Sequence, residues 1–448
     1  MANAETVSSA TSVAGSIAFS SHVSSSDNPW TKAKLSNGKK SYQNFKRKYR
    51  HVAALHSISQ PSRLSRDATN STSFVGFRNL MVLVVIVMNL RLVVENYIKY
   101  GVLICIRCHD IRRQDIVLGA ALYCLVPVHL FIAFLIEVLA SQQAKRAVGR
   151  RKRSDDDTQA SESEKERKSF NATWKYIAVA HSVNSTLCLS ITNLVVYFYI
   201  HHPGIGTLCE LNAITLWLKN CSYAFTNRDL RHAMLHPISP DLLPELYQDC
   251  PYPQNITFKN LTYFWWAPTL VYQPVYPRTS HIRWSFVLKR VLEMLGLSVF
   301  IWLTSAQYAA PLLRNSLDKL AVLDLPSIIE RVMKLSTISL IIWLAGFYAL
   351  FQSFLNALAE VTMFGDRSFY DEWWNSTNLQ MYWSAWNKPV YNFMKRHVFS
   401  PLIGRGWSVP AASAIVFTFS GFLHELAVGV PTHNILGTFD ATHLVDLE

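Results

Sequence analysis

Seven long apolar segments constrain the fold of this 448-residue chain more than any other feature of its sequence. A helix that crosses a hydrocarbon core of about 30 Å needs about 20 mostly apolar residues, and each segment supplies about that length. Only 16% of the residues are charged, against roughly a quarter in soluble proteins. We therefore predict an all-α, multi-pass helical membrane protein with spans at residues 74–98, 115–140, 174–200, 204–226, 290–312, 328–358 and 409–431.

The basic residues indicate how these spans are oriented. The net charge is +13, but the cations cluster beside apolar segments, which argues against a nucleic-acid partner and for contacts with the lipid bilayer. The most basic connections are the N-terminal segment and residues 141–173, and Lys and Arg accumulate on the cytosolic side of membrane proteins. Residues 227–289 and 363–408 are then expected to face the cytosol as well.

Residues 1–70 are rich in Ser, Asn, Lys and Arg without an apolar period, which predicts a disordered cytosolic N-terminal segment. They contain no signal-peptide pattern, so the first span is expected to act as the targeting signal. The seven cysteines show no paired framework, and no disulfide is expected. Cys105, Cys108 and His109 match the spacing of haem attachment, but a single match in a short connection is better explained by chance, and we expect no cofactor.

The stretch FYDEWWN, residues 369–375, concentrates aromatic and polar side chains in a connection expected to be cytosolic. The residues after it repeat apolar side chains every three or four positions up to Met394. This period predicts a helix in the membrane interface, broken or kinked at Pro389, although a helix that packs on neighbouring spans has the same pattern.

His424 and Glu425 lie side by side in the last apolar segment. His424 is 15 residues beyond Val409, or about 22 Å along a helix. Burial at low dielectric keeps an imidazole neutral, so that it can accept a proton as a general base. A histidine that is simply hydrogen-bonded within a bundle is the alternative. Zinc binding is disfavoured because Val428 occupies the second ligand position of an H-E-x-x-H pattern.

Other polar residues in the predicted spans either line a cavity or satisfy one another, and their spacing names no reaction. The sequence has no Gly-rich phosphate loop and no G-x-S-x-G nucleophile motif. These features fit a lipid enzyme or a transporter, and no internal repeat favours the transporter. The polar residues in question are His129, Glu137, His181, Asn184, Glu210, Asn212 and Lys219.

Several stretches in the same order resemble the membrane-bound O-acyltransferase family, in its branch of diacylglycerol and sterol acyltransferases. That branch carries the signature F-Y-x-D-W-W-N, and the likeness runs from about residue 74 to 437. The stretches are NLRLVVENYIKYG, LWLKNCSYAFTNRDLR, APTLVYQPVYPRTSHIR, FYDEWWN, YWSAWNKPVYNFMKRH and SGFLHELAVGVP. A membrane-embedded acyltransferase domain is therefore expected at residues 71–437.

The resemblance implies transfer of a fatty acyl group from acyl-CoA to the hydroxyl of diacylglycerol, in the endoplasmic reticulum membrane and by a homo-oligomer. His424 matches the catalytic histidine of the family and Asn375 its paired asparagine. Phe369, Tyr370, Trp373 and Trp374 match the part of the motif implicated in handling acyl-CoA. We group Glu372 and Glu425 with these substrate-binding residues, and expect direct transfer without an acyl-enzyme.

The chain departs from the family pattern at two places. Glu372 replaces the Asp of the signature, and the longer side chain is expected to accept the same local hydrogen bonds. Residues 438–448 do not resemble the family, and the domain is expected to be truncated at its C-terminus, which predicts little or no activity. The alternatives are therefore an acyl-CoA:sterol acyltransferase and an inactive truncated membrane protein.

Overall fold

The computed structural model describes residues 51, 56, 58–65, 72–87, 97, 98, 101, 112–151, 159–235, 244–321 and 324–434. The chain divides into Met1–Lys46, which lies outside these residues, and Arg47–Glu448, which contains all of them. The described residues form helices without a β-strand, apart from two isolated bridges that pair Gln60 with Asp366 and Arg278 with Phe364. The all-α prediction is confirmed.

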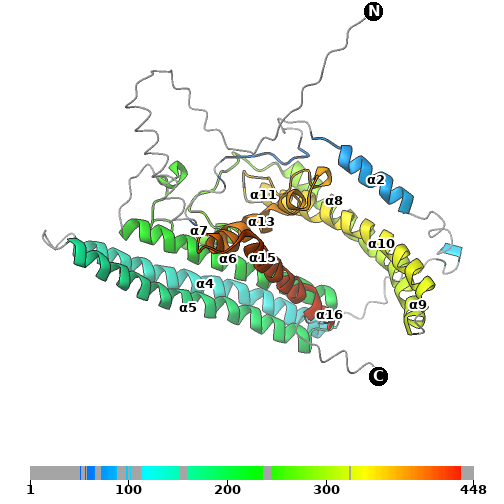
Figure 1. Ribbon diagram of the computed structural model, residues 1–448, viewed down its shortest axis with the longest axis horizontal. Coiled ribbons are helices and arrows are strands. Elements are labelled where there is room, and N and C mark those ends of the chain that lie inside the picture. The colour runs from blue at the N-terminus through cyan, green and yellow to red at the C-terminus, as the bar shows by residue number, and fades with distance from the viewer. Residues whose placement is uncertain are drawn as a thin grey trace, which may run out of the picture. The chain divides into compact units, whose positions relative to one another are not determined.

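Three long helices lie side by side along one side of this unit (Figure 1). Their contacts bury apolar side chains such as Cys188, Val196 and Leu216, each at most 1% exposed. The first helix continues to Arg151, past the predicted end at residue 140, and the second begins at Gln159, before the predicted start at residue 174. Helical hydrogen bonding therefore persists where the chain becomes polar. The three helices are α4 (Arg113–Arg151), α5 (Gln159–Tyr199) and α6 (Pro203–Leu235).

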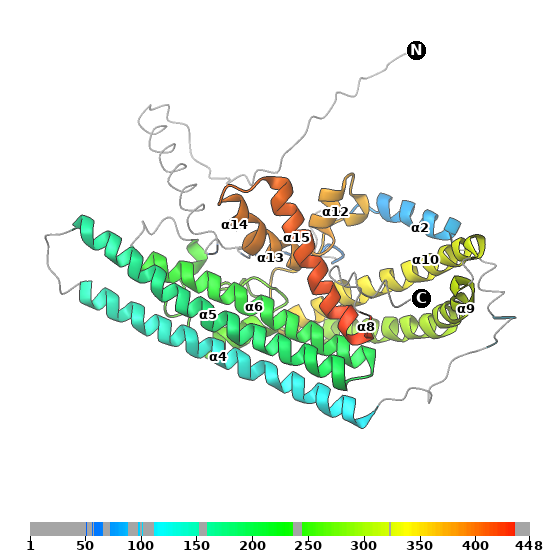
Figure 2. The same cartoon turned by 60° about the horizontal axis from the view of Figure 1, so that its bottom comes forward.

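A second group of helices forms an antiparallel hairpin, seen beside the first group in Figure 2. Each arm contains one π-helical turn, in which the backbone bonds run from i to i+5. The first arm is α8 (Trp284–Thr304), η3 (Ser305–Ala309) and α9 (Ala310–Ala321), and the second is α10 (Leu325–Phe347), η4 (Tyr348–Phe354) and α11 (Leu355–Val361).

The C-terminal helices cross the face of α6, as both ribbon views show. Pro389 lies in the first turn of α13 and Asn387 caps this helix by accepting a hydrogen bond from the Val390 N–H. The break predicted at this proline is therefore present. The elements are α12 (Leu379–Ala385), α13 (Lys388–Met394), η6 (Lys395–Phe399), α14 (Ser400–Ile403), α15 (Val409–His424), η7 (Glu425–Gly429) and α16 (Val430–Thr432).

Four helices among the described residues are long and apolar enough to cross a membrane: Arg113–Gly149, Ser169–Tyr199, Leu325–Val361 and Val409–Thr432. They coincide with the second, third, sixth and seventh predicted spans. The fourth and fifth predicted spans are helices, α6 and α8, but neither is among these four. The first is represented by α2 (Val75–Val87), and most of residues 88–98 lie outside the described part.

Most of the polar residues inside the predicted spans satisfy one another. His129 Nδ1 lies 2.8 Å from Asn184 Oδ1, and the Asn184 amide donates to the His129 carbonyl. Lys219 donates to the carbonyls at the end of α7 (Phe258–Trp266), at Phe264, Trp265 and Ala267. Such pairing is expected because an unpaired polar group in hydrocarbon is costly.

Part of the segment predicted to be disordered packs against this unit. His56 bridges Asp366 and Thr269, at 2.5 Å from Asp366 Oδ2 and 2.9 Å from Thr269 Oγ1. The Arg367 N–H donates to the Gln60 carbonyl. Several residues of 58–65 thus have hydrogen-bond partners about 300 positions away, which leave no local sequence pattern.

Candidate active site

The aromatic residues of FYDEWWN form a buried wall against the second helical arm. Phe369, Tyr370 and Trp373 are 2 to 6% exposed. The Trp373 ring lies 5.3 Å from Trp343 and 5.2 Å from Phe347, both of α10. Edge-to-face contacts at these distances add to the stabilisation from buried area. The aromatic side chains of the motif are thus packed into the fold.

Tyr370 fixes this wall to the π-helical turn η4. Its hydroxyl donates to Gln352 Oε1 at 2.7 Å. Burial raises the pKa of the Tyr370 hydroxyl above its ordinary value, so this group remains a neutral donor. The Ser62 hydroxyl donates to the same Gln352 oxygen at 3.3 Å, which joins the N-terminal segment to the motif.

Asp371 is held by two cations from distant parts of the chain. Its carboxylate lies 2.8 Å from Arg63 Nη2 and 2.9 Å from Lys388 Nζ. The Lys388 ammonium also donates to the Ser368 hydroxyl at 2.6 Å. These contacts tie residues 58–65, the motif and the start of α13 together.

The polar end of the motif caps helix α2. Asn375 Oδ1 accepts from the Gly76 N–H at 2.5 Å, and Asn375 Nδ2 donates to the Ser73 carbonyl at 3.0 Å. Glu372 accepts from the Ser73 N–H at 3.1 Å and from Asn375 Nδ2 at 2.9 Å. Trp374 Nε1 also donates to the Ser73 carbonyl at 3.0 Å. These bonds satisfy backbone groups that a helix start leaves unpaired.

Gly76 is required by this close contact. A Cβ at position 76 would lie 1.9 Å from the Trp374 carbonyl oxygen and 2.3 Å from Asn375 Oδ1. No side chain fits at such distances, so only glycine lets the start of α2 approach η5 (Trp373–Asn375) this closely.

His424 lies at the C-terminal end of α15 and has one hydrogen bond. Its Nδ1 is 2.7 Å from the Ser420 carbonyl oxygen, one turn earlier in the same helix. A carbonyl only accepts, so Nδ1 carries a proton and Nε2 is the nitrogen without a hydrogen-bond partner among the described residues. In the neutral ring, this is the tautomer that a general base needs. The π-helical turn η7 follows directly, a distortion that is frequent at functional sites.

The expected burial of His424 is wrong for the described residues, where its side chain is exposed. It shares an open face of the helix with Phe417 and Val428, at 51 and 56% exposure, while Leu423 and Ala427 on the opposite face pack against α6 and α13. Apolar sequence on all sides of a helix cannot show which face is covered, since lipid and protein accept the same residues. In a membrane-spanning α15, the imidazole ring faces the molecules of the apolar layer that surround this side of the helix.

Asn375 and His424 are not joined by a hydrogen bond among the described residues, and each is bonded elsewhere. Glu425 is partly buried with Oε1 unpaired in the described part of the chain, and no contact links it to the His424 ring. The sequence therefore located the two halves of the candidate site but not their relation.

A row of buried polar residues behind the motif escaped the sequence analysis. Gln352, Asn356 and Glu360 are 5% exposed or less and follow one another at intervals of four. Glu360 binds the guanidinium groups of Arg283 and Arg367, with Arg283 Nε at 3.1 Å and Arg367 Nη2 at 2.5 Å. The signal was present as polar residues at helical spacing, with Gln352 and Asn356 inside a predicted span and Glu360 just after it.

Comparison with known proteins shows the family to which this chain is similar. The model of the MBOAT, membrane-bound O-acyltransferase family matches residues 164–433, more than half of the chain. The chain is 31% identical over 376 residues to diacylglycerol O-acyltransferase 1 of Dictyostelium discoideum, covering 84% of this chain and 56% of that protein. It thus spans little more than half the length of this relative.

Two further relatives are covered more completely. The chain is 33% identical over 389 residues to diacylglycerol O-acyltransferase 1A of Glycine max, covering 86% of this chain and 72% of the relative. It is 34% identical over 377 residues to diacylglycerol O-acyltransferase 1 of Homo sapiens, covering 83% and 72%. With four apolar helices that can cross a membrane, the chain belongs to the membrane-bound O-acyltransferase family.

Proposed function

We propose that this protein transfers the acyl group of acyl-CoA to the free hydroxyl of diacylglycerol, giving triacylglycerol and CoA. The observation that carries this proposal is the similarity to diacylglycerol O-acyltransferases, at 31 to 34% identity over 83 to 86% of the chain. A sterol acceptor is the competing reaction, and the experiment below compares the two.

His424 is the proposed general base. The diacylglycerol oxygen attacks the thioester carbonyl carbon while Nε2 takes the hydroxyl proton, and the C–S bond then breaks. The departing thiolate receives that proton from the imidazolium, so no acyl-enzyme forms. The free Nε2 lone pair supports this role, because an alcohol attacks a thioester poorly unless its proton is removed as the bond forms.

The open face around His424 suits two lipophilic reactants. Phe417 and Val428 provide apolar surface beside the ring, and Gly421, one turn before His424, has no atom within 4 Å of the position of a Cβ. A long acyl chain and a diacylglycerol molecule can both reach the ring from the apolar layer.

FYDEWWN is assigned a positioning role. Phe369, Tyr370 and Trp373 are the aromatic wall proposed for handling acyl-CoA, and their burial supports a fixed surface. Asn375 uses both amide hydrogens on Ser73 and Glu372. Donation to a thioester oxygen would require one of these bonds to break, so we assign Asn375 to holding α2 rather than to the reacting atoms.

Two neighbouring cations after the motif, Lys395 and Arg396, differ in their availability to bind the phosphates of CoA. Arg396 is 9% exposed and donates to the His51 carbonyl, so it serves the fold. Lys395 is exposed and lies 5.5 Å from the Tyr391 ring, and it remains free to attract a polyphosphate. We further propose an endoplasmic reticulum membrane setting and a homo-oligomeric state, which the resemblance implies.

The test is an acyl-transfer assay in membranes from a host that makes no triacylglycerol of its own. Labelled long-chain acyl-CoA is added with diacylglycerol or with a sterol, at equal protein levels. We expect labelled triacylglycerol that depends on the intact chain. If sterol ester is the only labelled product, the acceptor is a sterol and not diacylglycerol. If no product is labelled, the proposed activity is rejected.

A further inference from the structure

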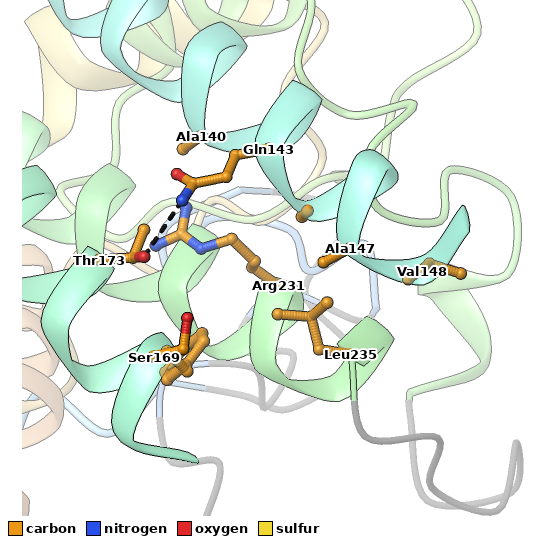
Figure 3. A pocket seen from close by; sticks show the side chains of 10 residues that line it. Ala140, Gln143, Ala147, Val148, Ser169, Thr173, Arg231 and Leu235 are labelled. Atoms are coloured by element: carbon orange, nitrogen blue, oxygen red, sulfur yellow. Dashed lines mark hydrogen bonds between the residues drawn. The ribbon is translucent and has the colours of Figure 1, made fainter. Parts of the chain in front are cut away.

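A small cavity lies between α4, α5 and α6, at the end where α4 stops and α5 starts (Figure 3). Its volume is about 120 Å³, several times the roughly 10 to 15 Å³ that one water molecule needs. Three alanines and Val148 of α4 leave this space because their side chains are short. The lining residues are Ala140, Gln143, Ala144, Ala147, Val148, Ser169, Phe170, Thr173, Arg231 and Leu235.

Arg231 lines this cavity and forms an ion pair with Glu137. Its side chain is 2% exposed, and Nη1 donates to Glu137 Oε2 at 3.2 Å. The other Glu137 oxygen lies 3.1 Å from His181 Nε2. The Arg231 Nε and Nη2 groups have no partner at hydrogen-bond geometry in the described part of the chain, and the Tyr252 hydroxyl is the neighbouring group that interacts with this guanidinium. Buried guanidinium N–H groups without acceptors are costly, so an acceptor is expected there.

Two side chains add donors to the same space. Gln143 Nε2 donates to Thr173 Oγ1 at 3.2 Å, which leaves the second amide hydrogen and the Thr173 hydroxyl hydrogen available. Figure 3 shows the Arg231 guanidinium pointing toward Gln143 and Thr173, with Ser169 nearer the start of α5. The cavity therefore presents several hydrogen-bond donors to one occupant.

The position of the cavity near the end of a membrane span indicates from where an occupant enters it. The span Arg113–Gly149 has 37 residues, about 55 Å of helix at 1.5 Å per residue, which exceeds a hydrocarbon core of about 30 Å. The cavity is lined by residues from the last ten positions of this span, which we place at the level of the lipid head groups. Lys145, Arg146 and Arg228 lie on the same end of these helices and favour an anion.

We infer that this cavity binds the phosphate of an anionic membrane lipid, with Arg231, Gln143 and Thr173 as donors to the phosphate oxygens. A phosphate has several acceptor oxygens on one centre and fits a donor set of this kind. The small α4 side chains and Phe170 then flank the glycerol end of the lipid. This site lies on α4, α5 and α6 and involves neither FYDEWWN nor His424.

The test measures thermal unfolding of the purified full chain in neutral-detergent micelles, since a ligand that binds only the folded state raises the midpoint, by an amount that grows with the logarithm of the ratio of ligand concentration to Kd. Three probes are titrated at equal ionic strength: a short-chain lipid with a phosphate monoester head, the matched phosphocholine lipid and inorganic phosphate. The phosphate monoester lipid is expected to raise the midpoint most. Stabilisation by inorganic phosphate alone would overturn the lipid assignment, and no stabilisation by any phosphate probe would overturn the site.

Variants locate the binding. The double variant Gln143→Leu/Thr173→Val removes donors with little change of volume, and Ala144→Leu fills the cavity while leaving the donors in place. Both variants are expected to bind the phosphate monoester lipid at least tenfold more weakly than the wild type. Gln142→Leu changes the exposed neighbour that does not line the cavity, and should bind within twofold of the wild type. Equal binding by the double variant and the wild type would overturn the assignment. Because the readout is binding, the result does not depend on acyl transfer.

Discussion

The two halves of the candidate site are bonded in opposite ways. In FYDEWWN, Tyr370, Asp371, Glu372, Trp374 and Asn375 each bond to residues from other parts of the chain. Among the described residues, His424 bonds only to the backbone of its own helix, and it lies on an exposed face. A side chain whose hydrogen bonds are all used within the protein supports structure, whereas one with a free lone pair on an open face can meet a substrate. This contrast supports the proposal that FYDEWWN positions the site and that His424 carries out the chemistry.

The largest expected effect tests the chemical half. His424→Ala should lower the rate of diacylglycerol acylation by about 10² to 10⁴, the range for loss of a general base, while the unfolding midpoint stays near that of the wild type. His281→Ala, which removes another exposed histidine outside the site, should keep its rate. The rates come from labelled acyl-CoA transfer in membranes, and an undiminished rate in His424→Ala would end the proposed role.

The next effect tests whether the motif is a scaffold. Gly76→Ala should destabilise the protein by about 3 kcal/mol, because the added Cβ overlaps the Trp374 backbone and the start of α2 must move. Gly296→Ala is the matched control, since a Cβ there meets nothing within 4 Å and its helix tolerates Ala well. Thermal unfolding in micelles compares the two. An unchanged midpoint in Gly76→Ala would show that α2 does not dock on η5.

Asn375→Ala separates a positioning role from a catalytic one. Loss of the amide removes the acceptor of the Gly76 N–H and one of the two donors to the Ser73 carbonyl, so we expect a destabilisation of about 2 kcal/mol together with a lower rate. A catalytic donor would behave differently, with the rate falling about 10² to 10³ at an unchanged midpoint. Measuring both quantities on the same preparation decides between the roles.

The smallest effect concerns Glu372, where the family signature has Asp. Glu372 reaches both the Ser73 N–H and Asn375 Nδ2. Glu372→Asp shortens the side chain and is expected to lose one of these bonds, which destabilises by about 1 kcal/mol. If the midpoint rises instead, the longer side chain is not what holds the start of α2 in this protein.

Local sequence pattern located the apolar helices of this protein but not its long-range contacts. The apolar runs of α4, α5, α10 and α15 were located because 20 apolar residues in a row have few other uses than to span a membrane. His56 was assigned to a disordered segment, yet it binds Asp366 and Thr269, more than 200 positions away. Asn375 was paired with His424 from the family motif, whereas it bonds to Ser73 and Gly76.

The amino-acid sequence alone determined the helical class, the membrane setting and the family motifs, since these depend on composition, period and local order. Only the tertiary structure decided that His424 is exposed, that its Nε2 is free and that the donors of Asn375 are already used. Exposure and hydrogen bonding depend on which surfaces meet in space, and residues 300 positions apart meet through packing that no local pattern encodes.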